Sequence, residues 1–235
     1  MFRHHSTEVA APKLLHRGHS VYGAMTPCSG KERPNVIHSI SPRSAVNGPG
    51  ERAVVWFQGC DLRCRGCFNL ATHPFDRNRD KPLDEVAEWI LSCHAIEGVT
   101  FSGGEPFQQA DDLRQLCEYI KLRRPDFSIG VFSGHTLQEL VRGRWHWKAP
   151  GEDAWIRGDP ALFTAIKQFL DFGVFGRFRQ TMACNDKPLC GSRNQKVVFF
   201  TNRYSPGEVM PQGFEVTISV DGKGVVITGF PPPSL

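Results

Sequence analysis

The stretch AVVWFQGCDLRCRGCFN, residues 53–69, joins an apolar run to three closely spaced cysteines. The run of residues 53–58 is typical of a buried strand, and Cys60, Cys64 and Cys67 follow it in a C-x3-C-x2-C pattern. Because α/β folds place their sites where parallel strands end, we expect this loop to lie at one edge of a sheet. Three thiols so close together are poorly explained by packing, so they indicate a metal or iron–sulfur site.

Together with the run at 53–58, the segments after this loop predict three successive β-loop-α units. Apolar residues recur at helical spacing in two segments, each followed by a short apolar run. The helices are expected at residues 84–93 and 111–124, and the strands at 99–102 and 128–132. A third helix is expected after Thr136, because Glu139 completes a capping-box sequence. This alternation predicts an α/β fold with a parallel sheet and right-handed crossovers. We expect a partial, open β/α barrel resembling part of a TIM barrel, because the chain is too short for eight repeats.

The remaining segments predict shorter elements around this core. Asn47–Gly50 reads as a tight turn, and Asp159 before Pro160 indicates a helix that ends near residue 170. Residues 145–158 and 176–195 are expected to be irregular. Further strands are expected at 36–40, 172–175 and 196–200, and a C-terminal hairpin at 214–220 and 225–228. Residues 1–34 are expected to form a disordered tail, and residues 35–235 a single domain.

The composition argues against several classes of protein. The chain has 235 residues, of which 40% are hydrophobic and 22% charged, so most of it is expected to fold. A net charge of +4 is too small to indicate nucleic-acid binding, and there is no apolar run of membrane-helix length. The first residues lack the apolar segment of a secretory signal peptide. We therefore expect a cytoplasmic protein with no nucleic-acid or membrane partner, in which the eight cysteines are ligands or free thiols.

Two kinds of metal site fit a loop with three cysteines. A structural zinc site needs a fourth ligand, but Cys93 and Cys117 lie on apolar helix faces and are better explained as core thiols. Three cysteines on a four-iron cluster leave one iron open to bind another molecule. We therefore favour a cluster. Cys184 and Cys190 are too few for a second full cluster and are expected to be plain thiols.

Two later strand ends carry residues suited to a small ligand. Ser102–Pro106 (SGGEP) follows the second expected strand, where the glycines leave the backbone accessible and Glu105 suits an ammonium group. Ser133-Gly134-His135 follows the third strand in the same way. Each motif alone is compatible with an ordinary turn. Three successive strand ends of this kind favour one shared site.

Together these motifs resemble the radical S-adenosylmethionine (radical SAM) enzymes, in which a C-x3-C-x2-C loop precedes a GGE motif. The closer resemblance is to the activating enzymes of glycyl-radical enzymes, specifically the anaerobic ribonucleoside-triphosphate reductase-activating proteins. Five stretches within about residues 45–200 carry it. They are Asn47–Gly50, Gly59–Asn69, Phe101–Pro106, Val131–Leu140 and Gly191–Gln195. The chain departs from the family pattern in its extra length and in having Cys190 where Arg is expected.

The resemblance implies two cofactors and a set of residues that bind them. Cys60, Cys64 and Cys67 would hold a [4Fe-4S] cluster, whose open iron would bind S-adenosylmethionine (SAM). Gly103, Gly104 and Glu105 would hold the methionine amino end, Gly66 and Phe68 would lie near the adenine, and Ser133 and Gly134 near the ribose or adenine. No catalytic side chain beyond the cluster and SAM is implied.

The resemblance also implies a reaction and its partners. An electron from a flavodoxin-type donor would cleave SAM to methionine and a 5′-deoxyadenosyl radical, which abstracts a hydrogen atom. In the activating enzymes this hydrogen comes from a glycine of a large reductase subunit, a protein substrate. Asp171, Asn194 and Gln195 would line the open side of the barrel. Two alternatives remain: a radical SAM enzyme acting on a peptide or small molecule, and a non-catalytic iron–sulfur or zinc module that binds a partner.

Overall fold

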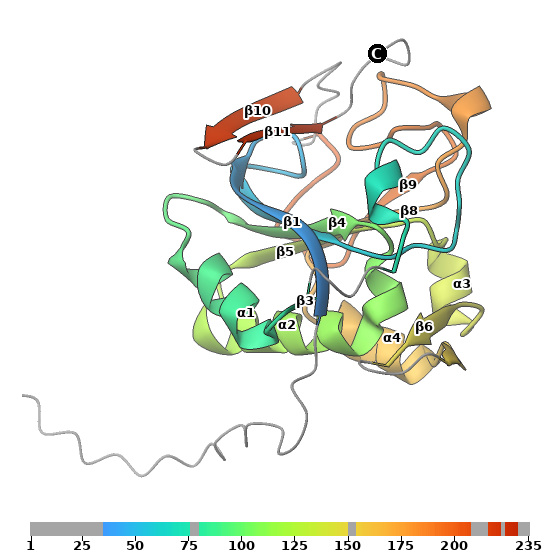
Figure 1. Ribbon diagram of the computed structural model, residues 1–235, viewed down its shortest axis with the longest axis horizontal. Coiled ribbons are helices and arrows are strands. Elements are labelled where there is room, and N and C mark those ends of the chain that lie inside the picture. The colour runs from blue at the N-terminus through green and yellow to red at the C-terminus, as the bar shows by residue number, and fades with distance from the viewer. Residues whose placement is uncertain (1–34, 76–79, 150–153, 208–215, 222–223, 230–235) are drawn as a thin grey trace, which may run out of the picture. The chain divides into compact units, whose positions relative to one another are not determined.

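An open sheet with helices on one face forms the core of the structure (Figure 1). The computed structural model describes residues 35–75, 80–149, 154–207, 216–221 and 224–229. Within them the sheet has seven strands in the order β3-β1-β2-β4-β5-β8-β9. The strands are β1 (Asn35–Ser44), β2 (Arg52–Phe57), β3 (Asp80–Lys81), β4 (Gly98–Gly103), β5 (Ser128–Ser133), β8 (Phe172–Phe175) and β9 (Lys196–Phe199).

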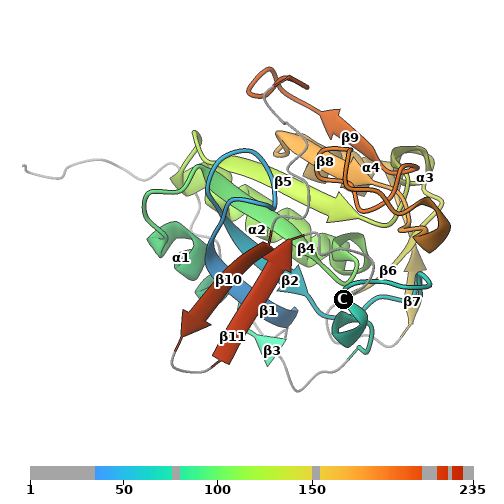
Figure 2. The same cartoon turned by 90° about the horizontal axis from the view of Figure 1, so that it is seen from above.

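The central strands β2, β4, β5 and β8 run parallel, as the β-loop-α pattern predicts. Figure 2 shows them side by side in the sheet. Every residue of β2 is buried, which explains why its sequence is apolar without the alternation of a half-exposed strand. Because parallel strands end at the same edge, the loops after these four strands are brought together there.

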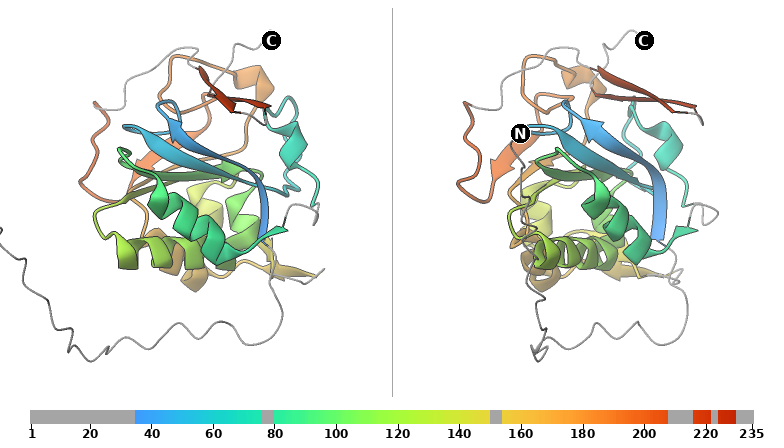
Figure 3. Two further views of the ribbon diagram at one scale, coloured as in Figure 1. Left: turned by 60° about the vertical axis from the view of Figure 1, so that its left-hand side comes forward. Right: turned by 90° about the vertical axis from the view of Figure 1, so that its left-hand side faces the viewer.

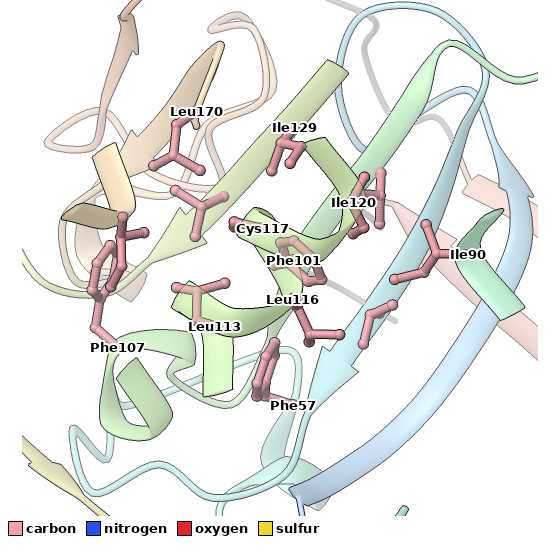
Figure 4. Packing of buried hydrophobic residues seen from close by; sticks show 14 of the residues in the cluster. Phe57, Ile90, Phe101, Phe107, Leu113, Leu116, Cys117, Ile120, Ile129 and Leu170 are labelled. Carbon is pink, nitrogen blue, oxygen red and sulfur yellow. The ribbon is translucent and has the colours of Figure 1, made fainter. Parts of the chain in front are cut away.

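The helices cover one face of this sheet, and the core lies between the two layers (Figures 1 and 3). The helices are α1 (Leu83–Ser92), α2 (Ala110–Arg123), α3 (Leu137–Val141) and α4 (Pro160–Lys167). The predicted inner face of α2, which includes Leu113, Leu116 and Cys117, is fully buried (Figure 4). Cys93 and Cys117 are free, buried thiols of this core, as predicted.

Both predicted helix starts are confirmed. The Thr136 side chain accepts a hydrogen bond from the Glu139 backbone N–H, and Glu139 bonds back to the Thr136 backbone N–H. Asp159 accepts a hydrogen bond from the Ala161 N–H at 2.7 Å, and Pro160 occupies the first helical position.

The prediction of an irregular segment at 145–158 is wrong. It contains a short antiparallel hairpin of β6 (His146–Lys148) and β7 (Trp155–Arg157). Three-residue strands are too short to establish a period-2 pattern, so no local pattern predicts them. Trp145, just before β6, is buried with its ring 5.9 Å from that of Phe107, which anchors the hairpin to the core.

The sheet is mixed at its edges and is not closed within the described residues. β1 pairs antiparallel with β2 at one side, and β9 pairs antiparallel with β8 at the other. A TIM-like barrel is therefore not confirmed, whereas the α/β class and the parallel core are. The predicted C-terminal hairpin is present as β10 (Val216–Asp221) and β11 (Gly224–Gly229). The predicted tail at 1–34 lies outside the described residues, and none of the described helices could cross a membrane.

A fully buried arginine organises the opposite end of the sheet, where the parallel strands begin. Arg52 donates to the backbone oxygens of Pro49, Val99 and Ser128 at 3.0–3.2 Å and lies over the Phe172 ring. Burial lowers the pKa of its guanidinium. The bonds link the turn at residues 47–50 to β4 and β5, so they help fix the register of the strands whose far ends carry the motifs.

Candidate functional site

The candidate site is built at the edge where the four parallel strands end. The register brings Phe57 at the end of β2 opposite Gly103 of β4, and Ser133 of β5 opposite Phe175 of β8. The cysteine loop, the SGGEP motif, the SGH motif and the loop at 176–195 therefore follow neighbouring strands. This confirms that the three predicted motifs share one edge.

The cysteine loop is closed at its base by backbone hydrogen bonds. Gly59 N–H donates to the Thr72 oxygen at 2.7 Å, and Cys60 N–H donates to the His73 oxygen at 3.0 Å. Gly59 has a φ of +104°, and a Cβ there would lie 2.4 Å from the Phe75 ring, so only glycine suits this position. These hydrogen bonds join the two ends of the loop that contains the three cysteines, and we call the loop pinned in this sense.

Three glutamines that the sequence analysis did not single out hold this loop in place. Gln108 bonds through its side chain to both the backbone N–H and the carboxylate of Asp61. Gln109 donates to the Gln58 oxygen at 2.8 Å, and the Gln58 amide donates to the oxygens of Ala71 and Pro74. Gln58, Gln108 and Gln109 are buried, and no local sequence signal identifies them, because their partners lie far along the chain.

The three thiols lie close enough for their charges to interact. Burial, the charge of Glu105 and the neighbouring thiols raise the pKa of Cys60 to about 12, and burial raises the pKa values of Cys64 and Cys67. In the described part of the chain, no three His, Cys, Asp or Glu side chains converge closely enough to hold a single metal ion. Three thiols on one pinned loop nevertheless fit an iron–sulfur cluster, which takes one thiolate on each of several irons.

The two glycines of SGGEP bring that motif directly against the cysteine loop. Gly104 N–H donates to the Phe57 oxygen at 2.8 Å, and Glu105 N–H donates to the Gly59 oxygen at 3.0 Å. A Cβ on Gly103 would lie 2.6 Å from Phe57 backbone atoms, and one on Gly104 only 2.3 Å from the Gly59 oxygen. Glycine is therefore needed at both positions first of all because the backbone packs too closely there for any side chain.

Glu105 connects the second and third strand ends. Its side chain is 0% exposed. Its Oε1 accepts from the Phe107 N–H at 3.0 Å and the Ser133 hydroxyl at 2.9 Å, and its Oε2 accepts from the Gly134 N–H at 2.7 Å. The carboxylate predicted to hold a ligand's ammonium group is therefore already engaged by three internal donors, and it binds the SGH motif to the SGGEP motif.

The loop at 176–195 packs against the cysteine loop from the other side. A Cβ on Gly66, whose φ is +72°, would lie 2.9 Å from the Gln180 side chain. The ring of Phe68, which is 44% exposed, lies 4.9 Å from that of Phe178. The Phe178 backbone N–H also bonds to the Cys64 sulfur. Gly66 and Phe68 are therefore brought to the same edge as the other predicted binding residues.

Asn194 and Gln195 hold this second loop on the end of β8. Gln195 Oε1 accepts from the Gly191 and Ser192 N–H groups at 2.9 and 3.0 Å, and its amide donates to the Gly176 oxygen. Asn194 donates to the Arg177 oxygen at 2.8 Å. Cys184 and Cys190 of the same loop form no disulfide, and their role as plain thiols stays a prediction.

Asp171 does not lie at this edge. It precedes β8, at the end where the parallel strands begin, and is buried there. Its carboxylate accepts from the Ile129 N–H at 3.0 Å and the Thr201 hydroxyl at 2.9 Å, and it pairs with Lys121 at 3.3 Å. The prediction that Asp171 lines the open side is therefore wrong: Asp171 holds β5 to β8.

His135 is a buried residue at the edge of the sheet where the parallel strands end. It is 3% exposed, and neither ring nitrogen has a partner within the described residues. Its backbone N–H donates to the Ser133 hydroxyl at 3.0 Å, so Ser133 both donates to Glu105 and accepts from His135. The predicted ligand residues Ser133 and Gly134 thus sit in a local network before any ligand is considered.

Comparison with known proteins agrees with this site. Residues 46–198 match the family described as 4Fe-4S single cluster domain. The chain is 28% identical over 173 residues to the anaerobic ribonucleoside-triphosphate reductase-activating protein of Vibrio cholerae, covering 70% of this chain and 97% of that protein. It is 31% identical over 136 residues to the protein of the same name from Enterobacteria phage T4, covering 51% and 87%. The pyruvate formate-lyase-activating enzyme of Clostridium pasteurianum is 39% identical over 90 residues, covering 35% and 38%.

The matched region contains the cysteine loop and every predicted cofactor-binding residue. The matches confirm the predicted enzyme class, an activating enzyme, and the predicted cofactors, a [4Fe-4S] cluster and SAM. The chain belongs to the 4Fe-4S single cluster domain family and, within the radical SAM superfamily, to the anaerobic ribonucleoside-triphosphate reductase-activating proteins.

Proposed function

We propose that this protein reductively cleaves SAM and abstracts a hydrogen atom from a glycine of an anaerobic ribonucleotide reductase. The observation that carries the proposal is the contact between the pinned cysteine loop and the SGGEP strand end, which places three thiols beside glycine backbone and a carboxylate. The names of the two reductase-activating relatives supply the protein substrate.

Cys60, Cys64 and Cys67 are the proposed ligands of the cluster. Since their pKa values are raised, the thiols are protonated in the absence of metal, and cluster binding has to displace their protons. When bound, the cluster would supply one electron for the reductive cleavage of the sulfonium C–S bond of SAM. The protein supplies the positions of the reactants and excludes water from them.

The proposed role of Gly103, Gly104 and Glu105 is to receive the amino end of SAM. Glu105 keeps one accepting position beyond its three internal hydrogen bonds, since an ionised carboxylate has about four. Its charge acts at Cys60, so it favours a cation held between the two motifs. Burial strengthens this attraction, because little water lies close to the carboxylate.

The nucleoside end of SAM is proposed to lie between the cysteine loop and the SGH motif. Phe68 offers a half-exposed aromatic face, and Gly66 offers backbone next to it. Gly134 lies against Leu62 of the cysteine loop, where a Cβ would come within 2.5 Å of the leucine side chain. Ser133 and Gly134 are thereby proposed to border the ribose or adenine.

The open sheet suits a macromolecular substrate. We propose that the sheet corresponds to part of a TIM-like barrel whose missing strands leave the site accessible to a reductase loop. We further propose a flavodoxin-type protein as the electron donor and the cytoplasm as the location, which would keep the cysteines reduced.

An anaerobic assay tests the proposal. Reconstituted protein is mixed with dithionite and SAM, and 5′-deoxyadenosine is measured; a candidate reductase is then added, and the glycyl radical is observed by EPR. We expect both products from the wild type. Cys64→Ala should lose the cluster absorbance and both products, whereas Cys184→Ser, a cysteine of the neighbouring loop, should keep them. A fully loaded wild-type protein that forms no 5′-deoxyadenosine contradicts the proposed function, and 5′-deoxyadenosine without a glycyl radical contradicts the proposed substrate.

A further inference from the structure

The net positive charge of the chain is concentrated on the two loops that meet at the site. Residues 59–75 and 176–195 carry six arginine or lysine residues and two aspartates, a net charge of +4. The whole chain of 235 residues also has a net charge of +4, so all other residues together are balanced. This edge is therefore basic in a protein that is otherwise neutral, and such an edge attracts partners of opposite charge.

Part of this charge is neutralised within the protein, and part of it is not. Arg177 pairs with Glu139, and Arg193 pairs with Asp186, both at 2.9 Å. Arg63, Arg65 and Arg179 are exposed and make no ion pair within the residues that the structure describes. We call these three residues the arginine rim.

The arginine rim adjoins Cys64, one of the three proposed cluster ligands. Arg63 and Arg65 flank Cys64 in the cysteine loop. Arg179 belongs to the facing loop and follows Phe178, whose backbone N–H bonds to the Cys64 sulfur. The two loops are also in contact at Gly66 and Gln180. A partner that binds the rim is therefore held next to Cys64.

We propose that the arginine rim is the docking surface of an acidic electron-transfer protein. The inference rests on the proposed function, in which each SAM cleaved consumes one electron: the donor loses it, and the cluster accepts it. Three guanidinium groups spread over two loops match a surface bearing several carboxylates better than one small anion. Because exposed ion pairs are individually weak and screened by salt, their joint effect is to steer and orient the donor.

A binding measurement tests the rim without any turnover. The anaerobically reconstituted protein is titrated with an oxidised flavodoxin of net negative charge, by calorimetry at low and high salt. We expect the triple variant R63Q/R65Q/R179Q to bind about tenfold more weakly at low salt and to lose most of the salt dependence. The control K81Q/R123Q/K167Q removes the same charge from exposed positions outside the two loops and should bind like the wild type. Equal weakening in both variants overturns the proposal.

A kinetic measurement separates the rim from the proposed function itself. Formation of 5′-deoxyadenosine is driven either by reduced flavodoxin or by the methyl viologen radical cation, a small donor that a cationic rim does not attract. We expect the rim variant to be slow with flavodoxin and normal with viologen.

Slow viologen-driven cleavage in the variant overturns the docking role, because it shows damage to the site. Normal viologen-driven cleavage with less glycyl radical on the reductase also overturns it, in favour of substrate binding. Tighter binding of double-stranded DNA than of flavodoxin assigns the rim to nucleic acid instead. A loaded wild type that is inactive with both donors refutes the proposed function, while the calorimetry still reports on the rim.

Discussion

Replacing Glu105 by Gln tests whether this buried side chain holds the strand ends together. The substitution keeps the shape of the side chain and removes its charge and one of its two accepting oxygens. In the protein, Oε1 accepts from Phe107 and Ser133, and Oε2 accepts from Gly134. Whichever way a glutamine amide is turned, at least one of these donors faces its NH2 group instead of an oxygen.

The cost follows from these three hydrogen bonds. A hydrogen bond to a charged group contributes about 1.5–3 kcal/mol, and a buried donor left without an acceptor costs about 1–3 kcal/mol. Glu105→Gln is therefore expected to lower the free energy of unfolding by about 2–4 kcal/mol. This is a large fraction of the roughly 5–15 kcal/mol that holds a domain folded.

Urea unfolding of the metal-free, reduced protein, followed by tryptophan fluorescence, measures this loss. Hydrogen exchange of the Gly134 amide gives a local readout, which should become faster in the variant because its acceptor is lost. Glu118→Gln, a partly exposed carboxylate of α2 paired with Arg114, is the matched control and should change stability by less than about 0.5 kcal/mol. If Glu105→Gln is as stable as this control and Gly134 exchanges at the wild-type rate, the reasoning is refuted.

Three further substitutions test other parts of the structure. Gly104→Ala places a methyl group 2.3 Å from the Gly59 oxygen, so we expect about 1–3 kcal/mol less stability and a lower iron content after reconstitution. Gly207→Ala is the control, because no atom lies within 4 Å of its added methyl group. Equal iron contents in the two variants would contradict the close packing at Gly104. His135→Phe replaces a buried ring without hydrogen bonds by an apolar one and should raise the free energy of unfolding by about 1 kcal/mol, whereas a clear loss of stability would reveal a partner for the imidazole. Glu139→Gln tests a pH effect. Burial acts to raise the pKa of Glu139, but hydrogen bonds from Thr136 and Arg177 and the charge of Arg177 outweigh it. The net result is a pKa below the usual value of 4.5. The ionised Glu139 side chain therefore contributes its full stabilisation above the usual pKa, and this is lost as the pH falls through the lowered pKa of the folded protein. The variant should thus lose less stability on acidification than the wild type. Parallel curves of unfolding free energy against pH for the two proteins would count against this interpretation.

The helix α2 and the strand β2 were predicted from patterns long enough to be unambiguous. In α2, four turns of apolar residues meet the sheet, and the prediction is right to within one residue at each end. The buried strand β2 was equally clear, because burial on both faces leaves an uninterrupted apolar run. In contrast, the hairpin at Trp145–Arg157 depends on a tertiary contact of one tryptophan with Phe107, which no local pattern contains.

For the site, the sequence predicted which residues share an edge but not what they do for one another. The spacing of the cysteines and the order of the strand ends were sufficient to place Cys60, Gly104 and Gly134 together. Asp171 was misplaced although it directly precedes the predicted strand at 172–175: the start of a parallel strand lies at the edge of the sheet opposite to the motifs, which follow strand ends. The buried glutamines Gln58 and Gln108 were missed because their role depends on partners far along the chain.

The two buried charges at opposite ends of the sheet are stabilised in different ways. Glu105 has no side-chain cation among its recorded partners in the described structure; its charge is stabilised by two backbone N–H groups and one hydroxyl. A buried carboxylate held in this way lacks full compensation, so it attracts a cation more strongly than one already paired with arginine. Arg52 is the opposite case at the other end, where backbone and hydroxyl oxygens surround a buried guanidinium. At that end every N–H group of the guanidinium has an acceptor, whereas we propose that at the cysteine end the Glu105 carboxylate, whose charge acts on Cys60, keeps one accepting position. We therefore propose that the buried charge at the Arg52 edge is structural, and that the buried charge at the Glu105 edge holds a cationic ligand.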